Sequence, residues 1–245
     1  MVSQTFTFRP VGIIHSCFKE KFGIPRQARL VPDAAARVEI LKPFDRDEAF
    51  KGLEQFSHIW VVFVFHVGTR DEWKPTVRPP RLGGNKRVGV FGTRSGFRPN
   101  PIGISAVELV GILREHGTLY LDIRGIDMLD KTPVLDIKPY LPYADSVDGA
   151  IGGFAPERPV VALKVDFTPQ ALATCKAIEK KIKGFKQLII QILQNDPRPA
   201  YYDISREKKD FGFRIHDVDV KWRVENSRAV VIAIDPYPTA DISSV

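Results

Sequence analysis

The segment from Gly89 to Ser105 concentrates the kinds of side chain that bind ligands. It holds two arginines, one asparagine and three hydroxyl residues, and its prolines restrict the backbone between two predicted strands. A stiff loop rich in hydrogen-bond donors is how a preorganised polar pocket is built. The alternative is a plain connector between strands, and we favour the pocket because of the density of polar groups.

A second cluster of chemically active residues lies between Asp127 and Tyr140. The period of two along a strand places Asp136 and Lys138 on the same face. A carboxylate and an ammonium group that point the same way form either an exposed ion pair or an acid–base pair with an anion holder. The pattern alone leaves both interpretations open.

Several common chemistries are excluded by the sequence. Residues 84–89 have the glycine spacing of a phosphate loop, but Val90 and Phe91 stand where a lysine and a hydroxyl residue are required. The chain has neither a dinucleotide fingerprint between a strand and a helix nor a serine in a nucleophile elbow. His58 and His66 would share a strand face, but two ligands do not make a metal site, and two cysteines cannot form a cysteine-rich zinc site. We therefore predict no bound metal.

The positive charge is concentrated in one stretch. The net charge of the chain is +7, and residues 70–98 hold eight basic residues against Asp71 and Glu72. Lysine and arginine displace the counterions of phosphates, so this stretch favours a polyanionic partner such as a nucleic acid. On charge alone, a solvated basic loop is an equal alternative.

The elements that position these residues are mostly short strands. Apolar alternation predicts strands at 5–8, 38–41 and 118–123, and a continuous apolar run at 59–65 predicts a strand covered on both sides. Further strands are predicted at 88–91, 104–113 and 134–137. Because no long amphipathic helices separate them, the fold class is mainly β, a barrel or a sandwich.

A glycine-rich connection at 146–156 predicts a domain boundary. Beyond it we expect a strand at 160–167, a helical stretch from Thr168 to about Asn195 broken at Gly184, and a hairpin formed by 211–224 and 228–234. The predicted domains are 1–147, a catalytic β-domain, and 157–236, a small α+β domain, followed by a flexible tail at 237–245. Because no secretory signal or membrane-spanning run is visible, we expect a cytoplasmic protein.

The motifs in these clusters closely resemble the TsaA-like, or TrmO, family of tRNA methyltransferases. The matching segments are 91–103 and 132–140, together with 21–27, 52–60, 78–85 and 196–201, which are spread over nearly the whole chain. The resemblance implies a β-barrel enzyme that works as a homodimer. Its methyl donor is S-adenosylmethionine, bound without a Rossmann domain near the subunit interface. Its substrate is N6 of the threonylcarbamoylated adenosine just 3′ of the tRNA anticodon.

The resemblance also implies the residues of the site, motif by motif. The expected donor-binding residues are Arg26, Gln27, Ala28, His66, Val67, Arg94, Ile104, Arg124, Gly125, Ile126 and Asp127. For tRNA binding we expect Arg78, Arg81, Lys86, Arg87, Arg98, Asn100, Arg198 and Tyr201.

Methyl transfer from a sulfonium is an in-line displacement, so positioning outweighs acid–base work. Our hypothesis is that Asp136 accepts the proton of the acceptor nitrogen and that Lys138 and Tyr140 orient it or bind the substrate carboxylate. Two alternatives stay open: a non-catalytic RNA-binding barrel, and a methyltransferase that acts on a different acceptor.

Overall fold

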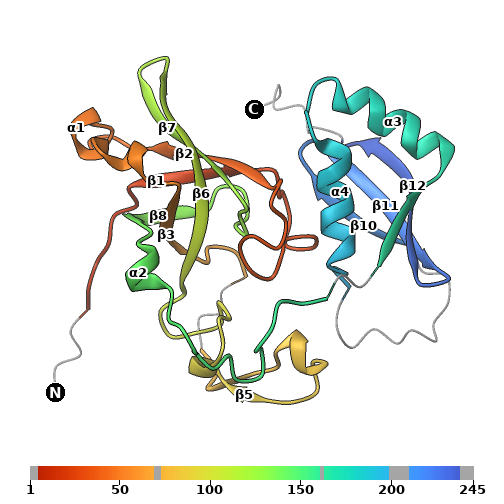
Figure 1. The fold of residues 1–245 in the computed structure, drawn as a ribbon, viewed down its shortest axis with the longest axis horizontal. Helices are drawn as coiled ribbons and strands as arrows, with labels where there is room; N and C mark the ends of the chain where they lie inside the picture. The colour runs from red at the N-terminus through yellow and green to blue at the C-terminus, as the bar shows by residue number, and fades with distance from the viewer. Residues whose placement is uncertain (1–4, 69–72, 161–162, 199–209, 238–245) are drawn as a thin grey trace, which may run out of the picture.

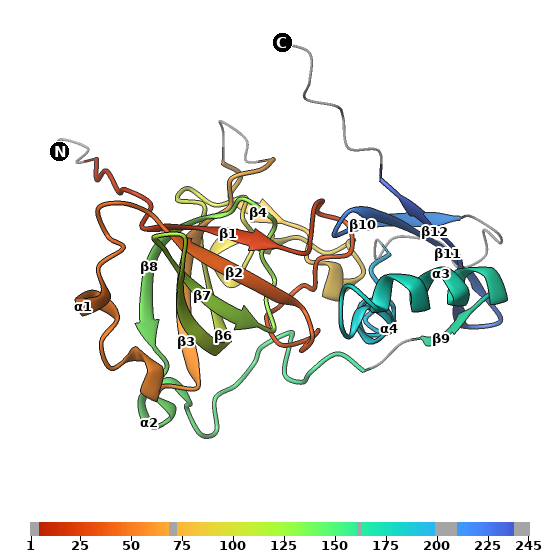
Figure 2. The same ribbon diagram turned by 90° about the horizontal axis from the view of Figure 1, so that it is seen from above.

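The computed structural model describes residues 5–68, 73–160, 163–198 and 210–237. The polypeptide forms two parts that lie side by side, a β-barrel and a smaller sheet covered by two helices (Figures 1 and 2). This confirms the predicted fold class, mainly β with a barrel followed by an α+β part. None of the helices in these ranges has both the length and the apolar character to span a bilayer.

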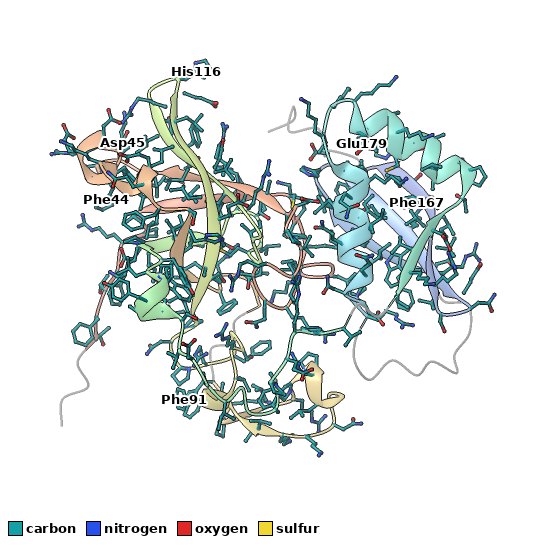
Figure 3. The ribbon with its side chains drawn as sticks, viewed as in Figure 1. Phe44, Asp45, Phe91, His116, Phe167 and Glu179 are labelled. Atoms are coloured by element: carbon teal, nitrogen blue, oxygen red, sulfur yellow. The ribbon has the colours of Figure 1, made fainter. Side chains whose placement is uncertain are left out.

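Six antiparallel strands close the barrel in the order β1-β2-β7-β6-β3-β8. Their interior side chains alternate with outer ones, as the pleat of a strand requires. The bounds are β1 Gly12–Ser16, β2 Ala35–Ile40, β3 His58–Val64, β6 Ile102–Glu115, β7 Thr118–Arg124 and β8 Pro133–Pro139. Figure 3 shows His116 at the tip of the long β6–β7 hairpin, which projects beyond the barrel.

Short elements decorate the barrel. A two-stranded ribbon, β4 Thr76–Val77 and β5 Val88–Gly89, projects from it with the turns η2 Pro80–Leu82 and η3 Val90–Gly92. The remaining short elements are α1 Asp47–Phe50, η1 Leu53–Gln55 and α2 Pro142–Asp145.

The second part is a four-stranded sheet of order β10-β11-β12-β9. Its elements are β9 Lys164–Phe167, α3 Pro169–Glu179, α4 Phe185–Gln194, β10 Phe211–Ile215, β11 Val218–Glu225 and β12 Arg228–Pro236. Thr168 caps α3 by accepting a hydrogen bond from the Ala171 amide at 3.2 Å. Gly184 separates the two helices with a left-handed backbone (φ 78°), as the sequence predicts.

Several expectations about single elements were wrong. Residues 5–8 form no strand, because Phe6 and Phe8 are exposed and have no neighbouring strand to pair with. In β3 only Ile59, Val61 and Phe63 face the core, because a barrel has one interior. Residues 211–224 are two strands, β10 and β11, which His216 and Asp217 separate. The predicted strand at 160–167 begins at Lys164, and the predicted tail lies outside the described residues beyond 237.

The loop between β1 and β2 joins the two parts. Phe18 is buried and forms a β-bridge with Ile215, and the His216 amide donates to the Cys17 carbonyl at 2.8 Å. At the other side of the loop, Gln191 of α4 accepts from the Asp33 amide at 3.0 Å and donates to its carboxylate at 2.7 Å. The second part therefore fixes both ends of a barrel loop.

We expect Phe18→Ala to lower the free energy of unfolding by about 3–5 kcal/mol, because it leaves a cavity at this junction. Phe8→Ala is the control, since an exposed side chain outside any strand contributes within about 0.5 kcal/mol. Urea denaturation monitored by circular dichroism measures both. A loss below about 1 kcal/mol for Phe18→Ala would contradict a packed junction.

Candidate functional site

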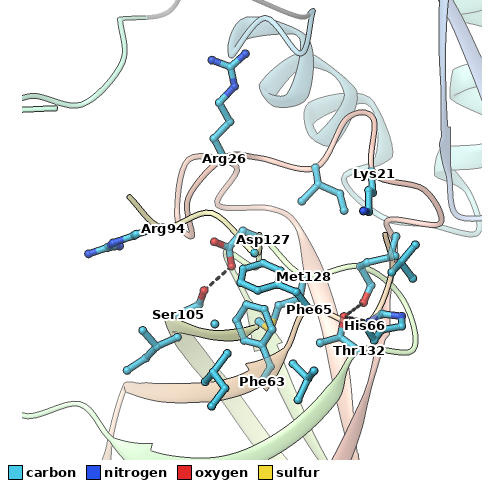
Figure 4. A pocket seen from close by; sticks show the side chains of 18 of the residues that line it. Lys21, Arg26, Phe63, Phe65, His66, Arg94, Ser105, Asp127, Met128 and Thr132 are labelled. Atoms are coloured by element: carbon cyan, nitrogen blue, oxygen red, sulfur yellow. Dashed lines mark hydrogen bonds between the residues drawn. The ribbon is translucent and has the colours of Figure 1, made fainter. Parts of the chain in front are cut away.

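A cavity of about 330 Å³ opens at one end of the barrel. The end of β3, the start of β6 and the turn after β7 meet there, and the β1–β2 loop and the loop at 94–98 complete the wall (Figure 4). Such a volume suits a small molecule rather than a macromolecule.

Aromatic rings form the floor of this cavity. Phe63 and Phe65 pack edge to face with centroids 5.2 Å apart, and Met128 lies beside them (Figure 4). Two glycines make room for the rings. A Cβ on Gly103 would lie 2.3 Å from the Phe63 ring, and one on Gly96 would lie 2.7 Å from that of Phe65. The rings can keep their places only while both positions lack a side chain.

Asp127 is the acid of the cavity. Its carboxylate accepts a hydrogen bond from Ser105 Oγ at 2.6 Å, as well as from the backbone amide of Ala28. Burial raises the pKa of Asp127, while these hydrogen bonds and the charge of Arg94 act against the rise. A carboxylate held by donors in an apolar surrounding attracts a cation or a further donor from a ligand.

Basic side chains line the rim of the cavity, and Arg94 lies near Asp127. Arg94 donates to Gln27 Oε1 at 2.8 Å, and Arg26 donates to the Arg198 carbonyl at 3.2 Å. Arg98 donates to the Thr93 carbonyl at 3.3 Å. Desolvation lowers the pKa of His66, and the charge of Lys21 adds to this effect. The rim therefore combines fixed cations with an imidazole that is neutral at neutral pH.

Two models of one family match most of the chain. Residues 13–146 match the family described as tRNA-methyltransferase O N-terminal domain, and residues 160–237 match the TrmO C-terminal domain. The chain belongs to the tRNA-methyltransferase O family.

Relatives and solved structures of this family cover nearly the full length. The tRNA (adenine(37)-N6)-methyltransferase of Escherichia coli K12 is 43% identical over 95% of this chain and 99% of its own. A Pseudomonas aeruginosa protein named putative S-adenosylmethionine-dependent methyltransferase RcsF is 48% identical, over 89% of this chain and 93% of its own. The crystal structure of TrmO from Pseudomonas aeruginosa superposes with a TM-score of 0.78 at 39% identity, over 94% of this chain and 98% of that one.

Most of the residues that the family resemblance implies for donor binding lie at the cavity. Seven of them line it: Arg26, Gln27, His66, Val67, Arg94, Ile104 and Asp127. Ala28 acts through its backbone amide on Asp127. Gly125 bonds to the β1–β2 loop through the Arg29 amide at 2.7 Å, Ile126 is buried in the core, and Arg124 is exposed away from the cavity.

The residues expected to be catalytic lie apart from this cavity within one chain. Asp136 and Lys138 form an exposed ion pair with 2.8 Å between Oδ2 and Nζ. Asp136 lies on β8, four residues after the lining residue Thr132, which is roughly 13 Å of extended chain. The ring of Tyr140 packs against Trp60, with 5.6 Å between centroids.

The described residues expected to bind tRNA lie in three places. Arg78, Arg81, Lys86 and Arg87 lie on or beside the β4–β5 ribbon, whereas Arg98 lines the cavity and Asn100 lies exposed in the loop before β6. Arg198 pairs with Asp196 at 2.7 Å below the β1–β2 loop. Tyr201 falls outside the described residues.

Sequence reasoning missed the apolar half of the site. Phe63, Phe65 and Met128 line the cavity but carry no polar group. The spacing of Phe63 and Phe65, two residues apart at the end of an apolar run, was the available signal, because it places both rings on one face.

We expect Gly103→Ala to weaken binding of S-adenosylmethionine at least about tenfold, because the new methyl group pushes the Phe63 ring into the cavity. Gly111→Ala is the matched control on the same strand, where an added Cβ meets nothing within 4 Å. Isothermal titration of both variants with this molecule measures the effect. Equal affinities in the two variants would contradict the tight fit.

Asp127 should also make stability depend on pH. Burial raises its pKa above the ordinary value of 3.8, so the free energy of unfolding falls as the pH rises from 3.8 to the folded pKa. Above the folded pKa the loss is complete and persists. Asp127→Asn removes the charge and keeps an acceptor for Ser105. We expect this variant to melt at an equal or higher temperature than the parent at pH 7, with the advantage lost below about pH 4. A variant less stable than the parent at pH 7 would show that the hydrogen bonds outweigh burial.

Proposed function

We propose that this chain transfers a methyl group from S-adenosylmethionine to N6 of the adenosine 3′ of the anticodon in tRNA, after that adenosine has been threonylcarbamoylated. Membership of the tRNA-methyltransferase O family, with relatives named tRNA (adenine(37)-N6)-methyltransferase and S-adenosylmethionine-dependent methyltransferase, supports the reaction class. The observation that carries the proposal for this chain is the cavity that joins aromatic rings, the Asp127 carboxylate and a cationic rim.

The residues of the cavity fit the chemical groups of this donor. The aromatic floor of Phe63 and Phe65 suits a purine ring and, through its negative face, a sulfonium cation. Asp127 suits hydroxyl or ammonium groups, while Arg94 and Arg26 suit a carboxylate at the rim. The cavity thus offers both an acid and cations to the charged groups of the donor, in a volume that suits a small molecule.

The bound donor supplies the methyl group from its sulfonium. The C–S bond breaks as the new N–C bond forms, and the rest of the donor leaves as a neutral thioether. The task of the protein is to hold the accepting nitrogen in line with that C–S bond. Asp136 accepts the proton that the nitrogen loses, and Lys138 holds the carboxylate in place at 2.8 Å.

For Asp136 to do this, a second copy of the chain must bring it to the cavity, because within one chain it lies outside the lining. We therefore propose a homodimer with the cavity near the interface. Ile102 and Ile104 at the cavity rim are 38% and 52% exposed, which supports an apolar contact there. We place this enzyme in the cytoplasm, where its tRNA substrate is found, and propose that the α+β part assists tRNA binding.

The direct test is nucleoside analysis of tRNA incubated with the purified protein and isotopically labelled S-adenosylmethionine. We expect label on N6 of the modified adenosine and none when threonylcarbamoylation is absent. Binding of the RNA without transfer would favour a non-catalytic RNA-binding barrel. Transfer to another molecule would favour a different acceptor.

Mixing two inactive variants tests the shared site. Arg94→Ala removes a cation from the cavity and Asp136→Asn removes the proton acceptor, so each homodimer should be inactive. In an equal mixture, half of the dimers are mixed and each of these has one intact site, which predicts about a quarter of the parent rate. If the two variants are shown to exchange subunits and the mixture still has no activity, Asp136 of a second copy is excluded as the proton acceptor.

A further inference from the structure

An exposed aromatic pair sits on the projecting ribbon. Trp73 and Phe91 are 50% and 73% exposed, with ring centroids 6.4 Å apart. Large aromatic side chains are seldom left in water as neighbours without a partner to cover them. Figure 3 labels Phe91 on the extension below the barrel, away from the α+β part.

The ribbon holds this pair at its base. Thr76 and Val77 pair with Gly89 and Val88, and the Val90 amide donates to the Pro75 carbonyl at 2.9 Å. Trp73 and Phe91 therefore flank the same end of the ribbon, where it returns to the barrel. Phe91 precedes Arg94, which lines the cavity, by only three residues, about 10 Å of extended chain.

The segment that carries the pair is strongly cationic, and its two acidic residues, Asp71 and Glu72, directly precede Trp73. Residues 73–100 contain no aspartate or glutamate and seven basic residues, Lys74, Arg78, Arg81, Lys86, Arg87, Arg94 and Arg98. Of these, Lys74, Arg78 and Lys86 have no hydrogen bond or ion pair to any part of the chain that the structure describes. Their charges are available to an external anion.

We propose that Trp73 and Phe91 form a stacking platform for unpaired bases of the substrate RNA, next to the mouth of the donor cavity. Unpaired bases stack on aromatic rings, while neighbouring lysines and arginines bind the phosphates that follow them. A second copy of this chain is disfavoured as the occupant, because a symmetric contact would bring two segments of like charge together. The inference rests on the proposed function and adds the surface that reads the single-stranded loop beside the target base.

The test compares RNA affinity and its salt dependence. We expect Trp73→Ala/Phe91→Ala to weaken binding of a synthetic anticodon stem–loop roughly 5- to 100-fold, by analogy with stacked bases elsewhere. The slope of log affinity against log salt should stay as in the parent, because stacking releases no counterions. Lys86→Ala should instead reduce the slope by about one.

Matched controls separate the platform from general effects. Phe6→Ala/Phe8→Ala removes two equally exposed rings from outside the basic segment and should leave affinity unchanged. Trp73→Phe keeps a stacking ring and should retain most of the affinity. Affinity for S-adenosylmethionine should be equal in all variants, which also shows that they fold.

Three results would overturn the platform. One is an unchanged affinity of the Trp73→Ala/Phe91→Ala variant for the stem–loop, and another is an equal loss of affinity for a fully paired duplex. The third is conversion of a dimer to a monomer, which would make the pair a contact between copies.

Failure of the proposed methyltransferase function gives a different set of results from failure of the platform. If the parent protein binds the stem–loop through this pair but transfers no methyl group to tRNA, the platform is supported and the enzymatic role is contradicted. If the parent methylates tRNA and the Trp73→Ala/Phe91→Ala variant binds the stem–loop as well as the parent does, only the platform is contradicted.

Discussion

Closure of the barrel is the constraint on which the site depends. The seam between β1 and β8 is the shortest in the barrel, with Gly12 opposite Val134 and Ile13 opposite Pro133. Gly12 has to be a glycine there, because a Cβ would lie 2.8 Å from the Glu39 carbonyl of β2. Once the seam is closed, the end of β3, the start of β6 and the turn before β8 share one rim. Residues more than 100 positions apart in the chain, such as Arg26 and Asp127, then face the same space.

The second constraint is the loop between β1 and β2, which has no regular structure of its own across the segment that lines the cavity. Its shape is set from outside. Gln191 of α4 binds Asp33, and Asn195 just after α4 donates to the Leu30 carbonyl. Glu20 accepts from the Arg214 amide at 2.9 Å. The described residues of the α+β part do not line the cavity, yet they hold the loop that carries Arg26 and Gln27.

The sequence predicted what local patterns encode. Apolar patterns predicted the barrel strands other than β1. Thr168 and Gly184 marked helix boundaries, because capping and left-handed turns depend on single residues. The family motifs located Arg94 and Asp127, but nothing local revealed the aromatic floor, since Phe63 and Phe65 look like ordinary core residues until the barrel closes. Periodicity placed Asp136 and Lys138 on one face correctly, yet it could not show that this face turns away from the cavity of the same chain. A short run such as 5–8 failed because alternation cannot supply a pairing partner.

The sharing of the β1–β2 loop between cavity and α+β part has an energetic consequence. A contact that orders this loop on one side reduces the conformational entropy lost when a second contact forms on the other side. Such coupling is equal in both directions. A molecule that contacts this loop in the barrel and one that contacts it from the sheet would therefore be linked through the same backbone, which the Phe18–Ile215 bridge attaches to the sheet.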